Sequence, residues 1–375
     1  MFISLPPANL RLTMILGFGE IMMRLATEGR RRFRQALPGR LDATWGGGEA
    51  NVCAALAMLG MASRFVTALP RHAITEQLAA SLRGLGVDTS RMLFTDKGRL
   101  GIYFLETGAN QRGPVVIYDR EGSSIALTAP DEYDFVGALA DVTWVHVTGI
   151  TPALSRNAFA STLALVELSK NRGIRVCCDL NFRKQLWNWK PGTKPQQLAR
   201  ECMVQILPQV DLLIGNEEDA KDVLGIEAEG ASVEQGKINS GGYESVARQI
   251  VAQFPNISLV AITLRESISA DHNNWGGMLF DARARQAFFA PRSAEGGYRP
   301  YEIRNIVDRV GAGDAFSAGL LYALNSEKFK QPATALEFAV AASCLKHSIP
   351  GDFNYATEDE IISLMRGTGT GRIKR

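Results

Sequence analysis

The chain has 375 residues, enough for one large α/β domain or two smaller domains around a sizeable core. Lys and Arg number 41 and Asp and Glu number 39, so the net charge of +2 excludes a global field for nucleic acid or anionic lipid. No apolar run reaches membrane-spanning length, so we expect neither a nucleic-acid nor a membrane partner.

The N-terminal stretch MFISLPPANLRLTMILGFGE lacks the charged start, apolar core and cleavage site of a signal peptide. Met14 opens the first strand-like run, so residues 1–13 are predicted to be an extension outside the fold. The five cysteines lack metal-ligand spacing. Cys177 and Cys178 would point to opposite faces of one strand, which makes them poor disulfide partners and favours a cytoplasmic protein with reduced thiols.

Short apolar runs alternate along the chain with longer stretches of helical periodicity. The runs predicted to be buried strands are Ile15–Gly19, Arg64–Ala68, Trp144–Thr148, Arg175–Asp179, Asp211–Gly215 and Leu259–Thr263. The stretches predicted to be helices are Ala50–Leu59, Glu76–Leu85, Ala153–Asn171, Pro195–Leu207 and Glu244–Phe254. This alternation predicts an α/β fold with a mostly parallel sheet, helices on both faces, and ligands at the carboxyl ends of the strands.

Two runs depart from this alternation. Leu100–Leu105 and Val115–Asp119 are predicted to form a hairpin around the glycines of 108–113, with no helix after it. The basic cluster at 30–34 is compatible with a nucleic-acid arm, but a solvated edge of the structure is the favoured interpretation. The polar, glycine-rich stretch Glu227–Gly242 is predicted to be a surface loop.

The segment Asp308 to Gly319, with the sequence DRVGAGDAFSAG, is the most informative in the chain. Gly311 and Gly313 allow a tight turn whose N–H groups converge on an anion at a helix start. Asp314 lies in the first turn of that helix, where the helix dipole stabilises a carboxylate that accepts a substrate proton. Such a pairing suits phosphoryl transfer to an alcohol. The alternative is a common glycine turn followed by an aspartate near a helix N-terminus.

A second glycine motif supports the catalytic interpretation. Residues 46–52 read GGGEANV and precede an alanine-rich helix that ends at Gly60. Together with GAGDAF, this motif resembles the paired N- and C-terminal signatures of the ribokinase-like (PfkB) carbohydrate kinases, and the likeness covers nearly all the chain from Met14. The resemblance implies a three-layer α/β fold in one domain, 14–375, with a small discontinuous β lid at about 20–46 and 98–123.

The same resemblance implies roles for the C-terminal motif. Asp314 would be the catalytic base, and the backbone of Gly311, Ala312 and Gly313 would stabilise the transferring phosphoryl group. Asn216 and Asp219 resemble an Asn-x-x-Glu element near the phosphates of ATP and magnesium. The shorter Asp219 favours a water-mediated role rather than direct metal ligation; helix capping after Asn216 is the alternative.

Other positions show clear departures from the family. Thr263 and Arg265 stand where many relatives have a Thr/Lys-x-Gly turn, and Arg265 is a candidate contact for nucleotide phosphate. Arg309 replaces a residue that belongs to a potassium site in some relatives, so no firm monovalent-ion requirement is predicted and dependence on such an ion stays open. Residues 347–352 lie near the expected adenine wall and are assigned no chemistry.

Three stretches resemble the 2-keto-3-deoxygluconate kinase branch of the family: GGGEAN, Tyr118-Asp-Arg120, and DLNFRKQLW at 179–187. The substrate-contacting positions of that branch correspond to Gly47, Tyr103, Tyr118, Arg120 and Arg183. Paired guanidinium groups suit the carboxylate of a sugar acid. The alternative is that the two arginines pair with nearby acids such as Asp119 or Asp179, and that the tyrosines merely pack the lid.

The sequence therefore predicts an ATP- and Mg²⁺-dependent kinase that phosphorylates the terminal C6 hydroxyl of 2-keto-3-deoxygluconate. A fructokinase-like or nucleoside kinase, and a catalytically silent sugar-binding regulator, are the rival hypotheses. Gluconate and galactonate stereochemistry both remain open. An exposed lid edge would need covering, so a homo-oligomer is expected.

Overall fold

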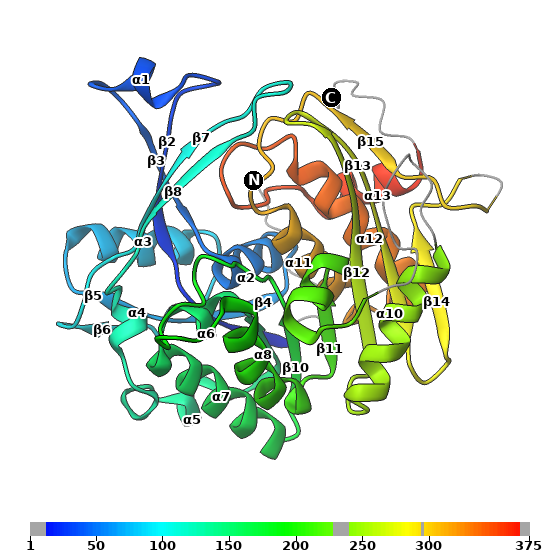
Figure 1. Ribbon diagram of the computed structural model, residues 1–375, viewed down its shortest axis with the longest axis horizontal. Coiled ribbons are helices and arrows are strands. Elements are labelled where there is room, and N and C mark those ends of the chain that lie inside the picture. Colours follow the sequence, from blue (N-terminus) through cyan, green and yellow to red (C-terminus); the bar gives the residue numbers. More distant parts are fainter. Residues whose placement is uncertain (1–12, 228–239, 294–295, 368–375) are drawn as a thin grey trace.

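The computed structural model describes residues 13–227, 240–293 and 296–367, so all but the last residue of the predicted extension 1–13 and most of the predicted loop 227–242 lie outside the described residues. A sheet of nine described strands forms the centre of the molecule (Figure 1). Six adjacent strands of this sheet run parallel to one another, as predicted. In sheet order they are β12 (Leu259–Ser269), β11 (Leu212–Gly215), β10 (Arg175–Asp179), β9 (Val142–Thr148), β1 (Met14–Phe18) and β4 (Ala62–Val66).

The sheet continues beyond β12 with strands that the sequence analysis did not predict. Strand β12 turns directly into antiparallel β13 (His272–Asp281), which also pairs with β14 (Gln286–Ala290) and β15 (Tyr301–Arg304). Thr263 to Ser267 stand where many relatives have a turn, but in this structure they lie in the continuous strand β12. Without the glycine of that turn, the chain stays extended and pairs with β13 over ten register positions.

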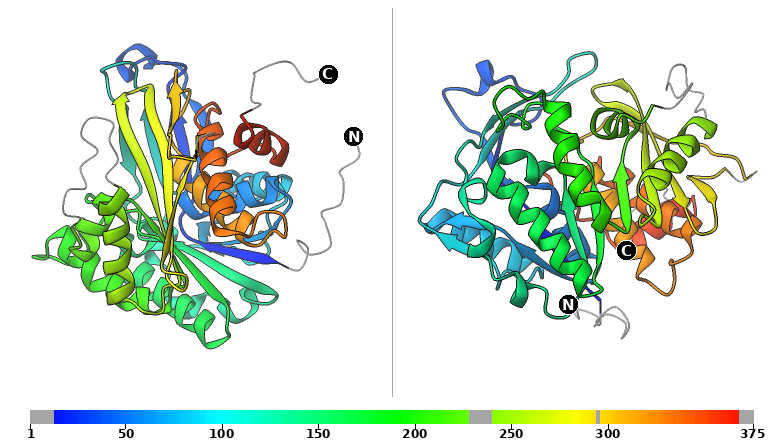
Figure 2. Two further views of the ribbon diagram at one scale, coloured as in Figure 1. Left: turned by 90° about the vertical axis from the view of Figure 1, so that its right-hand side faces the viewer. Right: turned by 60° about the horizontal axis from the view of Figure 1, so that its bottom comes forward.

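Helices cover both faces of the sheet (Figure 2). One face packs against α7 (Arg156–Asn171), α8 (Pro195–Ile206) and α10 (Ser240–Gln253). The other packs against α2 (Gly48–Met58), α11 (Ala312–Leu324), α12 (Pro332–Lys346) and α13 (Glu358–Met365). Cys177 and Cys178 belong to these two separate cores and are free thiols, because successive strand residues point to opposite faces.

The helix predicted over Ala153–Asn171 is in fact two helices, α6 (Ile150–Leu154) and α7. Ser155 has an extended backbone between them, and its hydroxyl accepts the N–H of Ala158 at 3.0 Å. This serine N-cap starts a new helix where apolar periodicity alone indicated continuity. Helix α3 (Ala73–Gly84) begins three residues before its predicted start and ends one residue before its predicted end. Other short elements are β5 (Ala68–Pro70), β6 (Leu93–Thr95), α4 (Ser124–Leu127), η2 (Pro130–Glu132), α5 (Phe135–Ala138), η3 (Leu207–Gln209), α9 (Glu217–Asp219) and η4 (Ala220–Leu224).

A second sheet stands over one edge of the main sheet (Figure 1). Its strands, in order, are β3 (Asp42–Gly46), β2 (Met22–Ala26), β7 (Ile102–Glu106) and β8 (Val115–Asp119), with α1 (Phe33–Ala36) at its far end. The predicted hairpin is confirmed by the antiparallel pairing of β7 with β8. We call this sheet the lid. Edge strand β8 is exposed along its whole length, and Ile117 is 51% accessible.

The outer end of the lid touches the turn between β12 and β13. The N–H of Ala270 donates to the carbonyl of Asn110 at 2.7 Å, and Arg30 pairs with Asp271 at 3.1 Å. Arg31 and Arg32 of the same basic cluster also face acids, namely Glu28 and Glu106, as expected for a lid edge.

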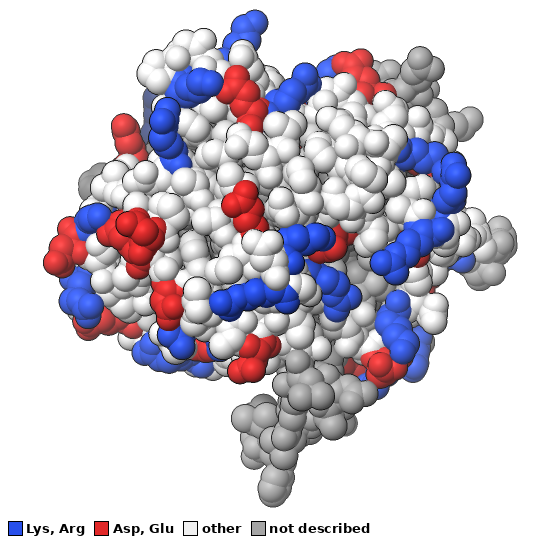
Figure 3. Space-filling model, turned by 90° about the horizontal axis from the view of Figure 1, so that it is seen from below, with Lys and Arg blue, Asp and Glu red and all other residues white. Residues whose placement is uncertain are grey.

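The surface shows no large one-signed area in the view from below. Figure 3 shows Lys and Arg interspersed with Asp and Glu over that face, in keeping with the net charge of +2. No helix in the described part of the chain is both long and apolar enough to cross a bilayer.

Candidate active site

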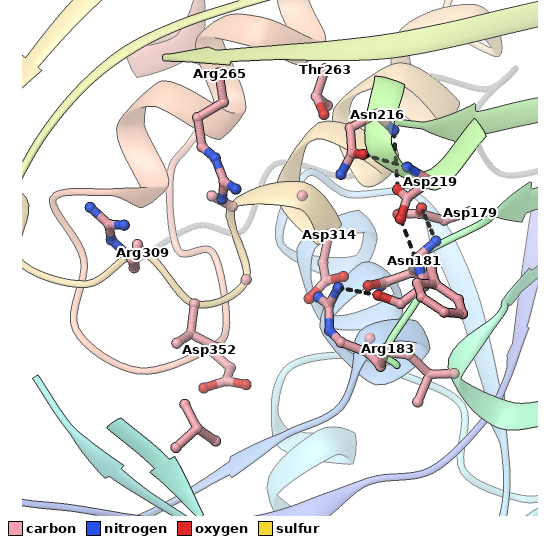
Figure 4. Close-up of a pocket in the computed structure, with 18 of the residues that line it drawn as sticks. Asp179, Asn181, Arg183, Asn216, Asp219, Thr263, Arg265, Arg309, Asp314 and Asp352 are labelled. Carbon is pink, nitrogen blue, oxygen red and sulfur yellow. Dashed lines mark hydrogen bonds between the residues drawn. The ribbon is translucent and has the colours of Figure 1, made fainter. Parts of the chain in front are cut away.

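A cleft of about 1240 Å³ lies between the lid and the carboxyl ends of the parallel strands. Parallel strands end at one edge of a sheet, so loops that are distant in sequence meet there. All thirteen residues predicted for the site line this one cleft: Gly47, Tyr103, Tyr118, Arg120, Arg183, Asn216, Asp219, Thr263, Arg265, Gly311, Ala312, Gly313 and Asp314. Figure 4 shows that several of them point toward the same space.

The glycine turn begins helix α11 as predicted. Gly311 is the N-cap, with a left-handed φ of 83°, and a β-carbon there would lie 2.2 Å from the carbonyl oxygen of Asp352. The first α11 hydrogen bond runs from the N–H of Ala315 to Gly311, so the preceding N–H groups have no partner within the helix. Because Ala312, Gly313 and Asp314 line the cleft, those N–H groups can bind an anion.

Asp314 is held by a residue that the sequence analysis did not single out. The amide of Asn51, in helix α2, donates to its carboxylate at 2.6 Å. Asn51 belongs to the GGGEANV motif, which carried the family resemblance without a role for this side chain. The motif therefore contained the signal, since a conspicuous polar residue inside an alanine-rich, buried helix needs a partner.

Burial shifts the pKa of Asp314 upward. Desolvation raises the pKa of Asp314 to about 6, although the Asn51 hydrogen bond and the nearby Arg183 and Lys346 act in the opposite direction. The position of Asp314 at the helix N-terminus favours the anion, whereas burial favours the protonated form. A carboxyl with a pKa of about 6 is suited to accept a proton at higher pH.

This pKa gives a testable pH dependence. A carboxyl group must be ionised to accept a proton, so kcat/KM is expected to rise as pH increases through about 6 and to level off above it. Neighbouring Glu49 is also buried, and burial raises its pKa to about 7. The variant Glu49→Gln shows which carboxyl causes the rise of kcat/KM with pH. A rise that persists in the variant belongs to Asp314, whereas loss of the rise would contradict this assignment.

Glu49 itself joins helix α2 to the end of β9. One carboxyl oxygen accepts the N–H of Thr148 at 3.1 Å and the hydroxyls of Thr148 and Thr151, each at 2.9 Å. These three bonds fix the start of α2 beside the strand end. They also orient the turn of α2 from which Asn51 reaches Asp314.

The two candidate arginines have different surroundings. Arg120 is buried, forms an ion pair with Glu20, and lies over the ring of Tyr118 at 5.3 Å. The alternative of a structural ion pair therefore holds for Arg120, but with Glu20 as its partner, because Asp119 pairs with Arg99.

Arg183 is exposed to the cleft. Its guanidinium donates to the carbonyl of Phe182 at 3.1 Å. No described carboxylate lies within ion-pair distance of it, although its charge favours the ionised forms of Asp179, Asp219 and Asp314. Figure 4 shows its guanidinium directed toward Asp314. The structure thus offers Arg183, more than Arg120, as a cation available to a ligand.

The remaining sugar-side predictions divide in a similar way. The Tyr103 hydroxyl already donates to Asp352 at 2.5 Å, whereas the exposed Tyr118 ring lies on the cleft wall. Gly47 is required by close approach, because a β-carbon at that position would lie 2.1 Å from the carbonyl oxygen of Glu20.

Asn216 and Asp219 cap each other's backbone. The N–H of Asn216 donates to Asp219 at 3.1 Å, and the N–H of Asp219 donates to the Asn216 side chain at 2.8 Å. The other Asp219 oxygen accepts the N–H of Phe182 at 3.0 Å. The alternative of helix capping is therefore realised, and Asp219 links two loops of the cleft. No cluster of three or more metal-ligating side chains occurs among the residues that the structure describes.

Thr263 extends from β12 beside Asn216, whereas Arg265 and Arg309 lie across the cleft from Asp219 (Figure 4). Arg309 donates to the carbonyls of Ser269 at 3.1 Å and Ala270 at 2.6 Å, so it is anchored to the β12–β13 turn. Asp352, which the sequence analysis left without a role, is buried at the cleft wall.

Comparisons with known proteins agree on one class of enzyme, the carbohydrate kinases. The model of the pfkB family carbohydrate kinases matches residues 12–248 and 284–354. A 2-dehydro-3-deoxygalactonokinase of Haloferax volcanii is 28% identical over 95% of this chain and 98% of its own length. The 2-dehydro-3-deoxygluconokinase structure from Thermotoga maritima is 39% identical, covers 95% of this chain and all of its own, and superposes with a TM-score of 0.84. A PfkB carbohydrate kinase structure from Listeria grayi is 31% identical over 94% of this chain and all of its own, with a TM-score of 0.81.

Proposed function

The chain belongs to the pfkB family of carbohydrate kinases, and from this premise we propose that it transfers the γ-phosphoryl group of ATP to the C6 hydroxyl of 2-keto-3-deoxygluconate. This compound is the 2-dehydro-3-deoxygluconate named for the Thermotoga maritima relative. One observation carries the proposal: the unpaired guanidinium of Arg183 and the carboxylate of Asp314 share one cleft beside a glycine turn.

Each part of the cleft has a task in this reaction. Asp314, held by Asn51, orients the hydroxyl and accepts its proton. The N–H groups at the start of α11 stabilise negative charge on the transferring group. Arg183 binds the carboxylate of the sugar acid with charge-assisted hydrogen bonds. The lid limits access of water, which protects ATP from wasteful hydrolysis.

The residues present fit ATP and its magnesium ion. Free N–H groups at 312–314 suit the phosphates, and a β-carbon placed on Gly313 meets no atom within 4 Å outside its own helix backbone and chain neighbours, which leaves room there for a ligand. Thr263 and Arg265, both on β12, are candidate nucleotide contacts in the same cleft. Magnesium, when bound with ATP, supplies neutralisation of phosphate charge. Asp219, whose short side chain is held by a backbone N–H at each oxygen, would act on it through water.

A coupled kinase assay over a panel of acceptors tests the substrate class. The panel contains 2-keto-3-deoxygluconate, its galactonate epimer, fructose and a nucleoside. We expect kcat/KM for the two acids to exceed that for fructose by roughly 10²-fold or more, the order expected for a charged partner. Preference for fructose or the nucleoside would support the rival enzymes, and no ATP turnover with any acceptor would support the silent regulator.

The two glycines of the turn are expected to respond differently to alanine. Gly311→Ala forces a β-carbon against the backbone of Asp352 and requires a left-handed φ, so both stability and turnover should fall. Gly313→Ala meets open space and should fold normally, but should weaken ATP use because the methyl group intrudes on the phosphates. Thermal unfolding and KM for ATP separate these effects, and normal ATP kinetics in Gly313→Ala would contradict phosphate binding here.

We also propose a homo-oligomer that covers the lid edge, in a cytoplasmic protein whose five cysteines are free. Strand β8 exposes Val115, Val116, Ile117 and Tyr118 along an unpaired edge, which invites pairing with a second copy. Ile117→Lys is expected to give a monomer by light scattering. An unchanged mass for Ile117→Lys would place the interface elsewhere, and a monomeric parent protein would contradict the oligomer.

A further inference from the structure

Arg24 reaches from the lid into a buried cluster of charges beneath it. Its side chain, on strand β2, is only 5% exposed. One guanidinium nitrogen donates to Asp352 at 2.8 Å, and the other pairs with Asp308. Tyr103, which lies beside Arg24 on strand β7, donates to the same Asp352 oxygen at 2.5 Å. Two neighbouring lid strands therefore bind one pair of carboxylates.

Both carboxylates belong to segments that shape the glycine turn. Asp308 accepts the N–H of Val310 at 3.0 Å and the N–H of Gly351 at 3.0 Å. The carbonyl oxygen of Asp352 lies 2.2 Å from where a β-carbon of residue 311 would stand, so this segment packs closely on Gly311. The fork of Arg24 thus bridges the two segments that set the position of this turn, three residues before Asp314.

A buried lysine completes the charge balance of the cluster. Lys346 donates to the carbonyl of Ile349 at 3.0 Å, and its stem packs beside Gly311. With Arg24, it balances the two negative charges of Asp308 and Asp352. Loss of Arg24 would leave a net negative charge next to the place where phosphates bind.

A second connection joins the lid to the same segment. The carbonyl of lid residue Asn110 accepts the N–H of Ala270, and Arg309 donates to the carbonyl of Ala270. Asp308 and Arg309 are consecutive residues before the turn. Asp308 pairs with Arg24 at the base of the lid, and Arg309 binds Ala270, which contacts the outer end of the lid. The position of the lid and the position of the turn are therefore mechanically linked.

We propose that Arg24 is a positioning residue for phosphoryl transfer, which acts through Asp308 and Asp352 to hold the glycine turn in place when the lid covers the sugar. The inference rests on the proposed function, because it assigns the turn to phosphate binding. It assigns Arg24 no contact with substrate. Its role is to make the geometry of the turn depend on the lid.

Arg24→Lys provides the first test, since lysine keeps the charge but presents a single ammonium group to two separated carboxylates. We expect kcat to fall roughly 10- to 100-fold, the loss that a small misplacement of reacting groups produces, with KM for the sugar nearly unchanged. The ratio of the rate of ATP hydrolysis without sugar to the rate of sugar phosphorylation should rise. A purely structural role would lower both rates alike. Arg99→Met is the matched control, because its ion pair with Asp119 lies in the same lid but on the surface.

A charge-balanced double variant covers the possibility of poor folding. Arg24→Met with Asp352→Asn removes one charge of each sign, so stability should approach that of the parent while kcat stays low. A parent-like kcat in either folded variant, or an equal loss in Arg99→Met, would overturn the proposal. All variants are assayed with whichever acceptor the parent protein uses best, so that a wrong substrate assignment leaves this test intact.

Discussion

Asp314→Asn is expected to lower kcat by roughly 10²–10⁴, the range typical for removal of a general base. Asparagine preserves the size of the side chain and a partner for Asn51, but it cannot take up a proton. Nucleotide affinity should change little, because the N–H groups at the start of α11 remain in place. Steady-state kinetics and nucleotide titration measure the two quantities separately.

The matched control for this variant is Asn51→Ala, which leaves the carboxylate but removes its 2.6 Å hydrogen bond. That bond lowers the pKa of Asp314, so its loss should move the rising limb of the pH profile to higher pH and lower kcat less than Asp314→Asn does. Near-normal turnover by a folded Asp314→Asn protein would mean that another group, or no group, takes the proton.

Arg183→Met is expected to discriminate between acid and neutral substrates. The variant keeps an apolar stem and deletes the guanidinium. The fall in kcat/KM for the keto-deoxy acid should correspond to a loss of about 2–4 kcal/mol in transition-state stabilisation, as when a charged hydrogen-bonded pair loses one partner. A neutral ketose should lose much less. The difference between the two substrates is the informative measurement, because a folding defect lowers both alike.

Arg120→Met is the comparison that the structure suggests. Arg120 is paired with buried Glu20, so its removal leaves an uncompensated carboxylate in the lid base. We therefore expect lower thermal stability and similar losses on acid and neutral substrates. Equal losses in Arg183→Met as well would assign that residue to the fold or the phosphates and would favour a fructokinase-like enzyme.

The sequence was sufficient to predict the parallel sheet and its covering helices because these elements depend on local patterns. Alternating strand and helix signals predicted the parallel sheet, and strand ends such as Asp179 and Gly215 then indicated where ligands would collect. Strand β13 was missed because it contains asparagines and the glycines Gly276 and Gly277, which are depleted in strands, and β14 and β15 were missed although they contain strand-favouring aromatic residues. Their pairing is determined by contact with β12 and with each other.

The partners of the site residues depend on contacts that no local pattern encodes. Arg24 and Asp352 are separated by 328 positions, and Asn51 and Asp314 by 263. Sequence motifs located Arg120 and Tyr103 in the cleft but could not reveal that Glu20 and Asp352 already bind them. The charge balance of the cluster beneath the lid was hidden for the same reason.

The packing of helix α2 against helix α11 has a consequence for folding during synthesis. Val52, Ala55 and Leu56 of α2 lie in one core with Phe316 and Leu320 of α11, so an early part of the chain receives its apolar cover from a late part. A nascent chain that ends before α11 leaves that core face uncovered and exposed to association with other chains. We expect refolding to be limited by this long-range closure, and C-terminally truncated chains to aggregate rather than persist as stable fragments.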